Sequence, residues 1–276
     1  MRQDPLVSVV MGSFEPCWSR LRRAVDSLVG QTLPEWELLL WDDGSSPQGA
    51  LALEQAARLD PRVRLVHARE NRGLAHGLNQ CVERARGPYI ARLDDDDLCF
   101  PQRLRRQVDF LWEHPAYQWV GSAALLLDES GPWGRLRPPT RPGRRDFLRA
   151  SPYIHPSVMF RREVLELAGG YREDKALFGC EDYELFARLH SRGFRGYNLP
   201  ECLLGYWESR ASYAKRTPAR RLREAAVRWQ GFRGLGLSGP RMVWGVLRPL
   251  GAALVPGAVR YRIKRRQRRL VRGQPL

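Results

Sequence analysis

Apolar residues in the first hundred positions alternate between short continuous runs and runs with helical spacing. Four continuous runs predict buried strands at residues 6–11, 37–41, 63–66 and 89–93. Helical spacing between them predicts helices over about 18–29, 50–59 and 74–84, the first with Leu21, Val25 and Leu28 on one face. This alternation is typical of an α/β fold with an open, mostly parallel sheet flanked by helices.

The pattern continues less regularly beyond residue 98. A helix is expected to follow the Pro101 turn and to run to Trp112, and a strand is expected over 119–127. Residues 131–143 are rich in Pro and Gly and predict a loop, which serves either acceptor contact or simple connection. An amphipathic helix begins at Glu181, with Leu185, Phe186 and Leu189 on its apolar face.

Acidic residues follow two of the predicted strands. Asp42 and Asp43 come after the second strand, and the run Asp94–Asp97 comes after the fourth. An open α/β sheet binds ligands outside the carboxyl ends of its strands. Adjacent carboxylates repel one another unless a cation lies among them. Hard oxygen ligands suit Mg²⁺ or Mn²⁺, which usually bridge carboxylates to a substrate's phosphates. A solvated acidic turn is the alternative interpretation.

Two common phosphate-binding motifs are absent from the sequence. The first predicted strand is not followed by G-x-G-x-x-G, and no G-x-x-x-x-G-K-[ST] occurs in the chain. The positive charge that a phosphate needs would therefore come from a metal ion at the acidic run.

The acidic run and its neighbours form an ordered series of motifs. The series resembles that of family 2 glycosyltransferases, over about residues 5–208. Each motif alone is weak, but their order and spacing are specific, in the series Val7–Met11, Trp41–Ser46, Glu70–Ala75, Gly87–Asp97, Pro101–Gln107, His155–Phe160, Gly169–Arg172 and Glu181–Leu185. The resemblance implies the GT-A fold, a Rossmann-like architecture that binds nucleotide-diphospho-sugars.

The resemblance also implies a set of binding residues. Asp43 matches the acid that contacts the nucleotide base, and Asp94 and Asp96 match the two acids of the family's D-x-D motif. Asp96 is expected to ligate Mn²⁺ or Mg²⁺, with Asp94 and His155 as further candidates; a purely structural histidine is the alternative for His155. The nucleotide-sugar site is expected to include Gly12, Ser13, Phe14, Glu15, Asp43, Asn71, Gly73, Asp94 and Asp95.

Asp182 matches the catalytic base of inverting family members. An acceptor hydroxyl that attacks an anomeric carbon must lose a proton, and a carboxylate within hydrogen-bond reach can take it. The departing nucleoside diphosphate gains negative charge, which a divalent ion offsets. A simple helix N-terminal acid is the alternative interpretation of Asp182. The expected reaction moves a sugar from a UDP- or dTDP-linked donor to a glycan or lipid-linked acceptor, with inversion.

The chain departs from the family pattern at three positions. Gly12 stands where the family usually has Pro, and Glu15 stands where it usually has Asn. Glu15 would lie near the nucleotide, where a diphosphate repels it unless it pairs with an arginine such as Arg72. Trp41 replaces a small aliphatic residue, a change that is expected to affect only packing.

The positive charge of the chain is confined to its end. Residues 1–209 hold 28 basic and 29 acidic side chains, whereas residues 210–276 hold 18 basic and one acidic. We therefore divide the chain into a catalytic domain, 1–209, and a basic amphipathic helical tail, 210–276. The apolar run 242–259 is interrupted by Arg248, Pro249 and Pro256 and is too broken to span a bilayer. Cations beside apolar and aromatic residues favour an anionic membrane surface.

Other roles for the tail are open at this stage. It could pack on the catalytic domain, bind a partner or form a nucleic-acid patch. Nucleic acid is disfavoured because no recognised binding module occurs. The five cysteines show no C-x-x-C spacing, and residues 1–5 lead directly into a strand. These features favour reduced thiols and a cytoplasmic protein, peripheral on the inner face of the cell membrane.

Two further functions compete with glycosyl transfer. A sugar nucleotidyltransferase of related fold would need a Gly-rich first loop with Arg and a catalytic Lys. The three lysines of this chain, Lys175, Lys215 and Lys264, all lie elsewhere. A catalytically silent scaffold is disfavoured by the presence of Asp94, Asp96 and Asp182.

Overall fold

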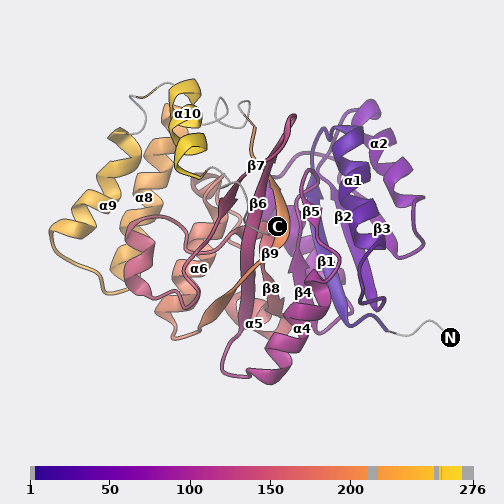
Figure 1. Ribbon diagram of the computed structural model, residues 1–276, viewed down its shortest axis with the longest axis horizontal. Coiled ribbons are helices and arrows are strands. Elements are labelled where there is room, and N and C mark those ends of the chain that lie inside the picture. Colours follow the sequence, from indigo (N-terminus) through magenta and orange to yellow (C-terminus); the bar gives the residue numbers. More distant parts are fainter. Residues whose placement is uncertain (1–3, 210–216, 252–254, 256, 269–276) are drawn as a thin grey trace.

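A single sheet of nine strands forms the centre of the protein (Figure 1). The computed structural model describes residues 4–209, 217–251, 255 and 257–268. Along the sheet the strands lie in the order β3-β2-β1-β4-β8-β6-β9-β5, with β7 paired to β6. Their bounds are β1 Val7–Ser13, β2 Trp36–Asp42, β3 Val63–His67, β4 Tyr89–Arg92, β5 Leu98–Cys99, β6 Trp119–Asp128, β7 Gly131–Leu136, β8 Met159–Arg161 and β9 Gly196–Trp207.

The first four strands form the parallel α/β unit that the sequence predicts. All seven residues of β2 are buried, as expected for a strand covered on both faces. The crossovers are α1 (Trp18–Val29), α2 (Pro47–Ala57) and α3 (Leu74–Arg84). Strand β1 pairs in parallel with both β2 and β4, so the carboxyl ends of these three strands lie at one edge.

The second half of the sheet is mixed. Strand β8 runs antiparallel to β4 and to β6, whereas β6 and β9 run parallel. The expectation of a mostly parallel sheet therefore holds only for the first half. The sequence analysis also did not identify β9, and the predicted loop at 131–143 begins with β7, a strand that contains Pro132. Proline is tolerated there because β7 pairs with β6 alone.

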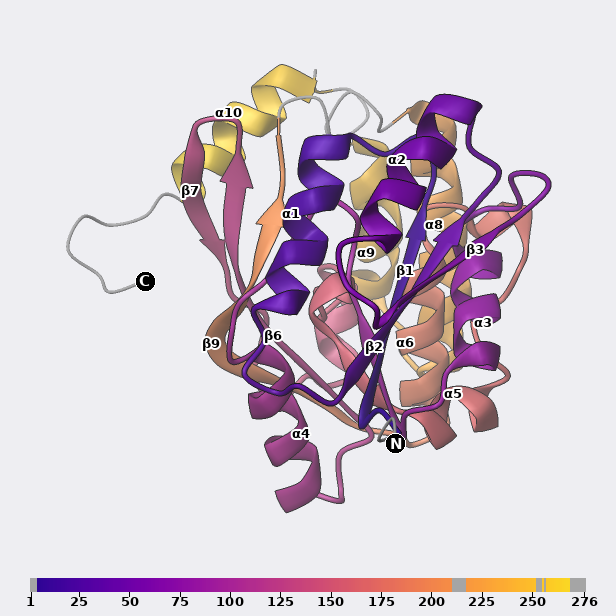
Figure 2. The same cartoon turned by 90° about the vertical axis from the view of Figure 1, so that its right-hand side faces the viewer.

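The sheet separates two hydrophobic clusters. One face packs against α1, α2 and α4 (Arg103–Glu113), with Leu28, Leu53 and Leu104 fully buried. The other face packs against α3, α5 (Arg162–Ala168) and α6 (Glu181–Ser191). Figure 2 shows the same arrangement after a quarter turn.

The described residues of the predicted tail include the helices α8 (Pro218–Gly234), α9 (Pro240–Gly251) and α10 (Gly257–Gln267). Val227, Phe232 and Met242 of α8 and α9 belong to the same buried cluster as Phe186 of α6. None of the described helices is long and apolar enough to cross a bilayer. Residues 1–3 of the predicted catalytic domain, and residues 210–216, 252–254, 256 and 269–276 of the predicted tail, lie outside the described residues.

Candidate active site

The carboxyl ends of β1, β2 and β4 bring several predicted site residues together. Ser13 ends β1, and its hydroxyl donates a hydrogen bond of 2.5 Å to Asp95, which follows β4. Ser13 and Asp95 lie 82 positions apart in the sequence, so only the parallel pairing of β1 with β4 places them in contact. The structure thus joins the loop after β1 to the acidic run.

Asp43 holds the loop that precedes α3. Its carboxylate accepts hydrogen bonds from the backbone N–H groups of Arg72, at 3.1 Å, and Gly73, at 2.7 Å. Gly73 has φ 89°, a conformation that glycine adopts without strain. The side chain of Asp43 is 5% exposed. Asp43, Asn71 and Gly73 therefore lie in one small region, as expected, and Asp43 orders its backbone.

Gly44 allows that loop to approach β2 closely. A Cβ at this position would lie 2.7 Å from the carbonyl carbon of Glu70 and 2.8 Å from the backbone nitrogen of Asn71. Its φ of +74° also falls in the left-handed region. The backbone conformation and the close contact with the loop therefore require glycine at position 44 of the Trp41–Ser46 motif.

Glu15 binds the start of α2 rather than an arginine. Its carboxylate accepts hydrogen bonds from the backbone N–H of Ser46, at 2.6 Å, and from the Ser46 hydroxyl, at 3.0 Å. Arg72, the predicted partner of Glu15, instead lies 3.7 Å from the carboxylate of Glu173. The expected Glu15–Arg72 pair is therefore wrong. A helix N-terminus carries partial positive charge, so it stabilises this carboxylate.

Gly12 and Phe14 complete the loop after β1. A Cβ on Gly12 would lie 2.9 Å from Cδ1 of Leu74, so glycine makes room for the first residue of α3. Phe14 is 52% exposed. The exposed ring beside a loop of predicted nucleotide-binding residues is available to contact a ligand.

The four aspartates of the acidic run differ in their surroundings. Asp97 is 1% exposed, and one of its oxygens accepts a hydrogen bond of 2.7 Å from the backbone N–H of Trp207 in β9. Burial, together with Asp94 and Asp96, raises the pKa of Asp97 well above its usual value. Burial also raises the pKa of Asp95, and the Asp94 carboxylate adds to this rise. Asp94, Asp95 and Asp96 are only half-buried.

Arg92 supplies a cation beneath the acidic run. The side chain is 1% exposed and forms an ion pair with Asp94. Within the described part of the chain, its Nε and Nη1 atoms make no hydrogen bond. Arg92 also lines the adjacent cavity, although its Nε and Nη1 atoms are themselves buried. No role was predicted for Arg92, although only Leu93 separates it from the acidic run.

The donor set at the acidic run fits a divalent cation that shares its coordination with a substrate. Among the described residues, no three His, Cys, Asp or Glu side chains converge into a ready-made metal site. Mg²⁺ is usually held by one or two carboxylates, with phosphate oxygens and waters completing its shell. Arg92 pairs with one of the four carboxylates, Asp94, and the charges of Asp94 and Asp96 add to the effect of burial in raising the pKa of Asp97.

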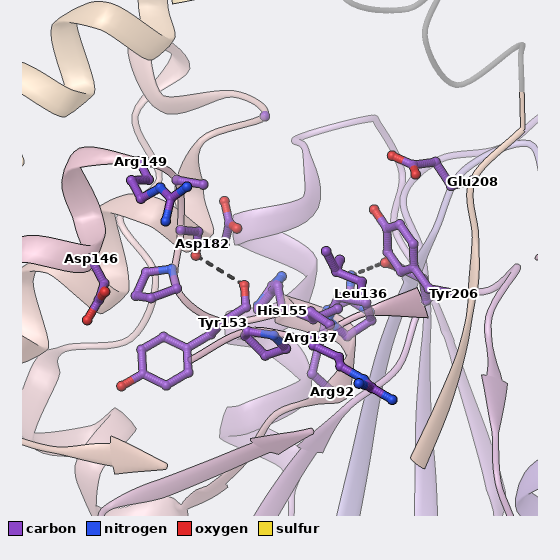
Figure 3. A pocket seen from close by; sticks show the side chains of 18 of the residues that line it. Arg92, Leu136, Arg137, Asp146, Arg149, Tyr153, His155, Asp182, Tyr206 and Glu208 are labelled. Carbon is purple, nitrogen blue, oxygen red and sulfur yellow. Dashed lines mark hydrogen bonds and ion pairs between the residues drawn. The ribbon is translucent and has the colours of Figure 1, made fainter. Parts of the chain in front are cut away.

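A cavity of about 730 Å³ lies beside the acidic run (Figure 3). It is lined by Asp94 and Arg92, by the start of α6, by η2 (His155–Ser157) and by residues that follow β7. Asp182 lies in the first turn of α6 and faces this cavity. Burial raises the pKa of Asp182 to about 6, and the carboxylate of Glu181 contributes to the rise. A carboxylate with this pKa is well matched to proton uptake near neutral pH.

His155 lines the same cavity but is already engaged. Its Nε2 lies 2.8 Å from the hydroxyl of Tyr171, and the ring is buried. Burial and the nearby Arg92 hold the pKa of His155 well below its usual value, so the ring is neutral. Only Nδ1 is left to serve as a ligand atom. In a structural role, His155 would therefore have a specific hydrogen-bond partner, the hydroxyl of Tyr171.

The remaining walls come from segments to which the sequence analysis gave no definite role. Leu136, Arg137 and two prolines after β7 line one side, and Tyr206 and Glu208 of the β9 end line it as well. Lys264 and Arg268 of the tail reach the same cavity. The charge of the tail gave no indication that it would contribute to this site.

Comparisons with solved structures identify the fold of the protein. The fold is that of GT-A glycosyltransferases. A mannosyltransferase from Pyrobaculum calidifontis, PcManGT, in complex with GDP-Man and Mn²⁺, has a TM-score of 0.63 at 21% identity, over 96% of this chain and 81% of its own. S. aureus TarS 1-349 in complex with UDP-GlcNAc has a TM-score of 0.66 at 17% identity, over 88% of this chain and 71% of its own.

Sequence relatives assign the family. Residues 8–168 match the model of glycosyl transferase family 2, and the chain belongs to that family. It is 36% identical over 269 residues to EpsE of Bacillus subtilis, which is named as a glycosyltransferase. The match covers 96% of each chain. It is 33% identical over 187 residues to AmsE of Erwinia amylovora, an amylovoran biosynthesis glycosyltransferase, covering 67% of this chain and 69% of that one. The protein is a glycosyltransferase, as the motif series predicted.

Proposed function

We propose that the protein transfers a hexosyl or N-acetylhexosaminyl group from a UDP- or dTDP-linked donor to a hydroxyl of a glycan or lipid-linked acceptor, with inversion. The observation that carries the proposal is that Asp182 and Asp94 line one cavity, with the pKa of Asp182 raised to about 6. A base and a diphosphate-binding run on the same cavity can act on the two partners of one reaction. Enzymes of this fold that bind UDP-GlcNAc and GDP-Man support a nucleotide-sugar donor.

The donor is proposed to lie across the carboxyl ends of β1, β2 and β4. Ser13, Asp43, Asn71 and Gly73 surround the nucleotide, and Phe14 offers an exposed ring to the base. Asp94 and Asp96 are proposed to hold Mn²⁺ or Mg²⁺, with His155 Nδ1 as a further candidate ligand; such an ion supplies Lewis-acid stabilisation of the departing diphosphate. The charge of the buried Arg92 guanidinium, which pairs with Asp94, can add to this stabilisation.

The acceptor is proposed to enter the cavity from the side of α6 and the residues after β7. Asp182 takes the proton of the attacking hydroxyl, so the acceptor oxygen must come within hydrogen-bond reach of this carboxylate. Tyr153, Ile154 and Tyr206 also line this cavity, so a sugar of the acceptor would lie beside them. Inversion follows if the hydroxyl attacks the anomeric carbon from the face opposite the diphosphate.

A ligand panel tests this proposal. Thermal stabilisation is measured with UDP, dTDP and GDP, each with and without Mn²⁺. A ligand at 100 times its dissociation constant adds about 2.7 kcal/mol if it binds only the native state. We expect a Mn²⁺-dependent rise in Tm with UDP or dTDP that is lost in Asp96→Ala. A response to none of the nucleotides contradicts the proposal, and a response to GDP alone contradicts the donor class.

We also propose that residues 1–209 carry out catalysis while the tail, residues 210–276, holds the enzyme on the inner face of the cell membrane. Helix α9 presents Val243, Trp244 and Leu247 to solvent, with Trp244 69% exposed. Arg241 and Arg248 flank these apolar side chains and are exposed as well. Apolar and aromatic residues beside cations match an anionic lipid surface, and each cation there contributes about 1 kcal/mol. Such a surface would bring the enzyme to a lipid-linked acceptor.

A further inference from the structure

Helix α10 is fixed to the β6–β7 hairpin by side-chain contacts. The Tyr261 hydroxyl donates a hydrogen bond of 2.6 Å to Asp128 at the end of β6, and its ring packs edge-on against Trp133 of β7. The guanidinium of Arg265 lies 3.2 Å from the same Asp128 carboxylate. Figures 1 and 2 both show α10 beside β7. This part of the tail therefore has a defined place on the catalytic domain.

The end of α10 comes into backbone contact with β7. The carbonyl of Arg268 accepts a hydrogen bond of 3.1 Å from the N–H of Arg135. A Cβ on Gly134 would lie 2.6 Å from that same carbonyl oxygen, so only glycine permits the approach. The hydrogen bond and the glycine therefore fix the position of the end of α10 along strand β7.

This placement brings two cations of α10 to the active-site cavity. Lys264 and Arg268 lie 3.8 Å and 3.4 Å from the two carboxylate oxygens of Glu208, which is buried. All three side chains line the cavity, together with the exposed Arg137 after β7. Three cations and one carboxylate thus form one wall, which we call the basic wall. In Figure 3 Arg137 and Glu208 lie on the opposite side of the cavity from Asp182.

The wall is built from other elements than the proposed donor site, and Asp94 and Arg92 are the part of the donor site that lines the same cavity. The donor diphosphate is expected at the ends of β1 and β4, where four aspartates lie and a metal ion would provide positive charge. The basic wall is built from β7, the end of β9 and α10, and it shares its cavity with the proposed base, Asp182. An anion bound at the wall would therefore belong to the molecule that delivers its hydroxyl to Asp182.

We propose that Arg137, Lys264 and Arg268 bind a phosphate or diphosphate group carried by the acceptor, an inference that rests on the proposed glycosyl transfer. Lys264 and Arg268 already hold one carboxylate at the wall, and a phosphate group offers them more charge and more acceptor oxygens. The basic tail thus serves substrate recognition inside the active site as well as any surface role. An acceptor that lacks the phosphate loses these contacts.

Binding of a small prenyl diphosphate tests the proposal. The probe is geranyl diphosphate, with geraniol as its uncharged counterpart, titrated calorimetrically into full-length protein saturated with UDP and Mg²⁺. The variants are Lys264→Gln and Arg268→Gln. Arg262→Gln, an exposed position of the same helix that does not line the cavity, removes the same charge and serves as the control. Lys264→Arg keeps the charge.

We expect geranyl diphosphate to bind the UDP-loaded protein and geraniol to bind at least tenfold more weakly. Lys264→Gln and Arg268→Gln should each weaken binding of the diphosphate about tenfold, while Lys264→Arg and Arg262→Gln change it less than threefold. The affinity for UDP should stay unchanged in every variant.

Three results would overturn the proposal. UDP could displace geranyl diphosphate, which would place the probe in the donor site. The second result is an equal loss of geranyl diphosphate binding in Lys264→Gln, Arg268→Gln and Arg262→Gln, which would indicate nonspecific attraction by the tail. The third result is an affinity for geranyl diphosphate that is the same in Lys264→Gln, Arg268→Gln and the wild-type protein. Failure of the proposed function is a separate result, because it appears as a lack of any nucleotide response in the wild-type protein.

Discussion

The hydroxyl of Ser13, at the end of β1, donates a 2.5 Å hydrogen bond to the carboxylate of Asp95, which follows β4. This contact ties the proposed nucleotide loop to the acidic run. Burial raises the pKa of Asp95, whereas the hydrogen bond from Ser13 lowers it. The serine therefore helps to keep Asp95 ionised beside the proposed diphosphate site.

Removing that hydroxyl should weaken donor binding. Ser13→Ala leaves a half-buried carboxylate without its donor, which favours the protonated form and disturbs the loop. We expect UDP affinity in the presence of Mn²⁺ to fall about fivefold to tenfold by isothermal titration calorimetry. Ser13→Thr keeps a hydroxyl and should retain most of the affinity. Equal affinities for wild type and Ser13→Ala would show that the contact has no role in binding.

Asp182→Asn should abolish transfer and stabilise the fold at alkaline pH. The folded-state pKa of Asp182 is raised to about 6, so the neutral form is favoured in the native state and ionisation costs stability as pH rises through that value. The asparagine variant avoids this cost, so its Tm should exceed that of wild type at pH 8 and match it at pH 4. Wild-type kcat/KM should fall below about pH 6, as the base becomes protonated.

Asparagine at position 96 and asparagine at position 97 should differ in their effect on the Mn²⁺-dependent UDP response. Asp97 is buried, bonded to the Trp207 backbone, and its pKa is raised well above the usual value. Asp97→Asn can keep that hydrogen bond and remove the repulsion, so the Mn²⁺-dependent UDP response should persist. Asp96→Asn removes a proposed metal ligand and should eliminate the Mn²⁺ dependence. Thermal shifts of the two variants, with and without Mn²⁺, provide the comparison.

Glu15→Gln separates a capping role from repulsion of the donor. The carboxylate accepts from the backbone N–H and hydroxyl of Ser46 at the start of α2. Loss of the anion there should lower stability by about 0.3–1 kcal/mol. Because the charge is engaged by the helix end, UDP affinity should change less than twofold. A marked gain in UDP affinity would instead indicate that Glu15 repels the diphosphate.

Trp244→Ala tests the proposed membrane surface. Binding to vesicles of anionic lipid should fall several-fold, because the exposed indole of α9 is expected to enter the headgroup region. Trp112 of α4 is 77% exposed and lies outside the tail, so Trp112→Ala is the matched control and should bind as wild type does. Cosedimentation with anionic and with zwitterionic vesicles gives the measurement. Equal binding by both variants would contradict the assignment to α9.

The sequence predicted the elements that rely on local pattern. Helix α1 and helix α3 have the expected bounds, and the four parallel strands lie where continuous apolar runs predicted them. Strands β1, β2 and β4 are readable because burial on both faces requires consecutive apolar residues, whereas in β3 only Val63 is buried. The motifs after β1, β2 and β4 likewise indicated which loops would meet, since parallel strands share one edge at their carboxyl ends.

The sequence did not determine contacts that depend on distant pairing. The partner of Glu15 is the start of α2, whereas Arg72 lies against Glu173. Strand β7 forms in a Pro- and Gly-rich stretch because β6 supplies hydrogen bonds on one side. The charge of the tail was plain from composition alone, but its place in the cavity was not. Contacts such as those of Tyr261 and Arg265 with Asp128, and the absence of a side chain at Gly134, bring Lys264 and Arg268 to the active site.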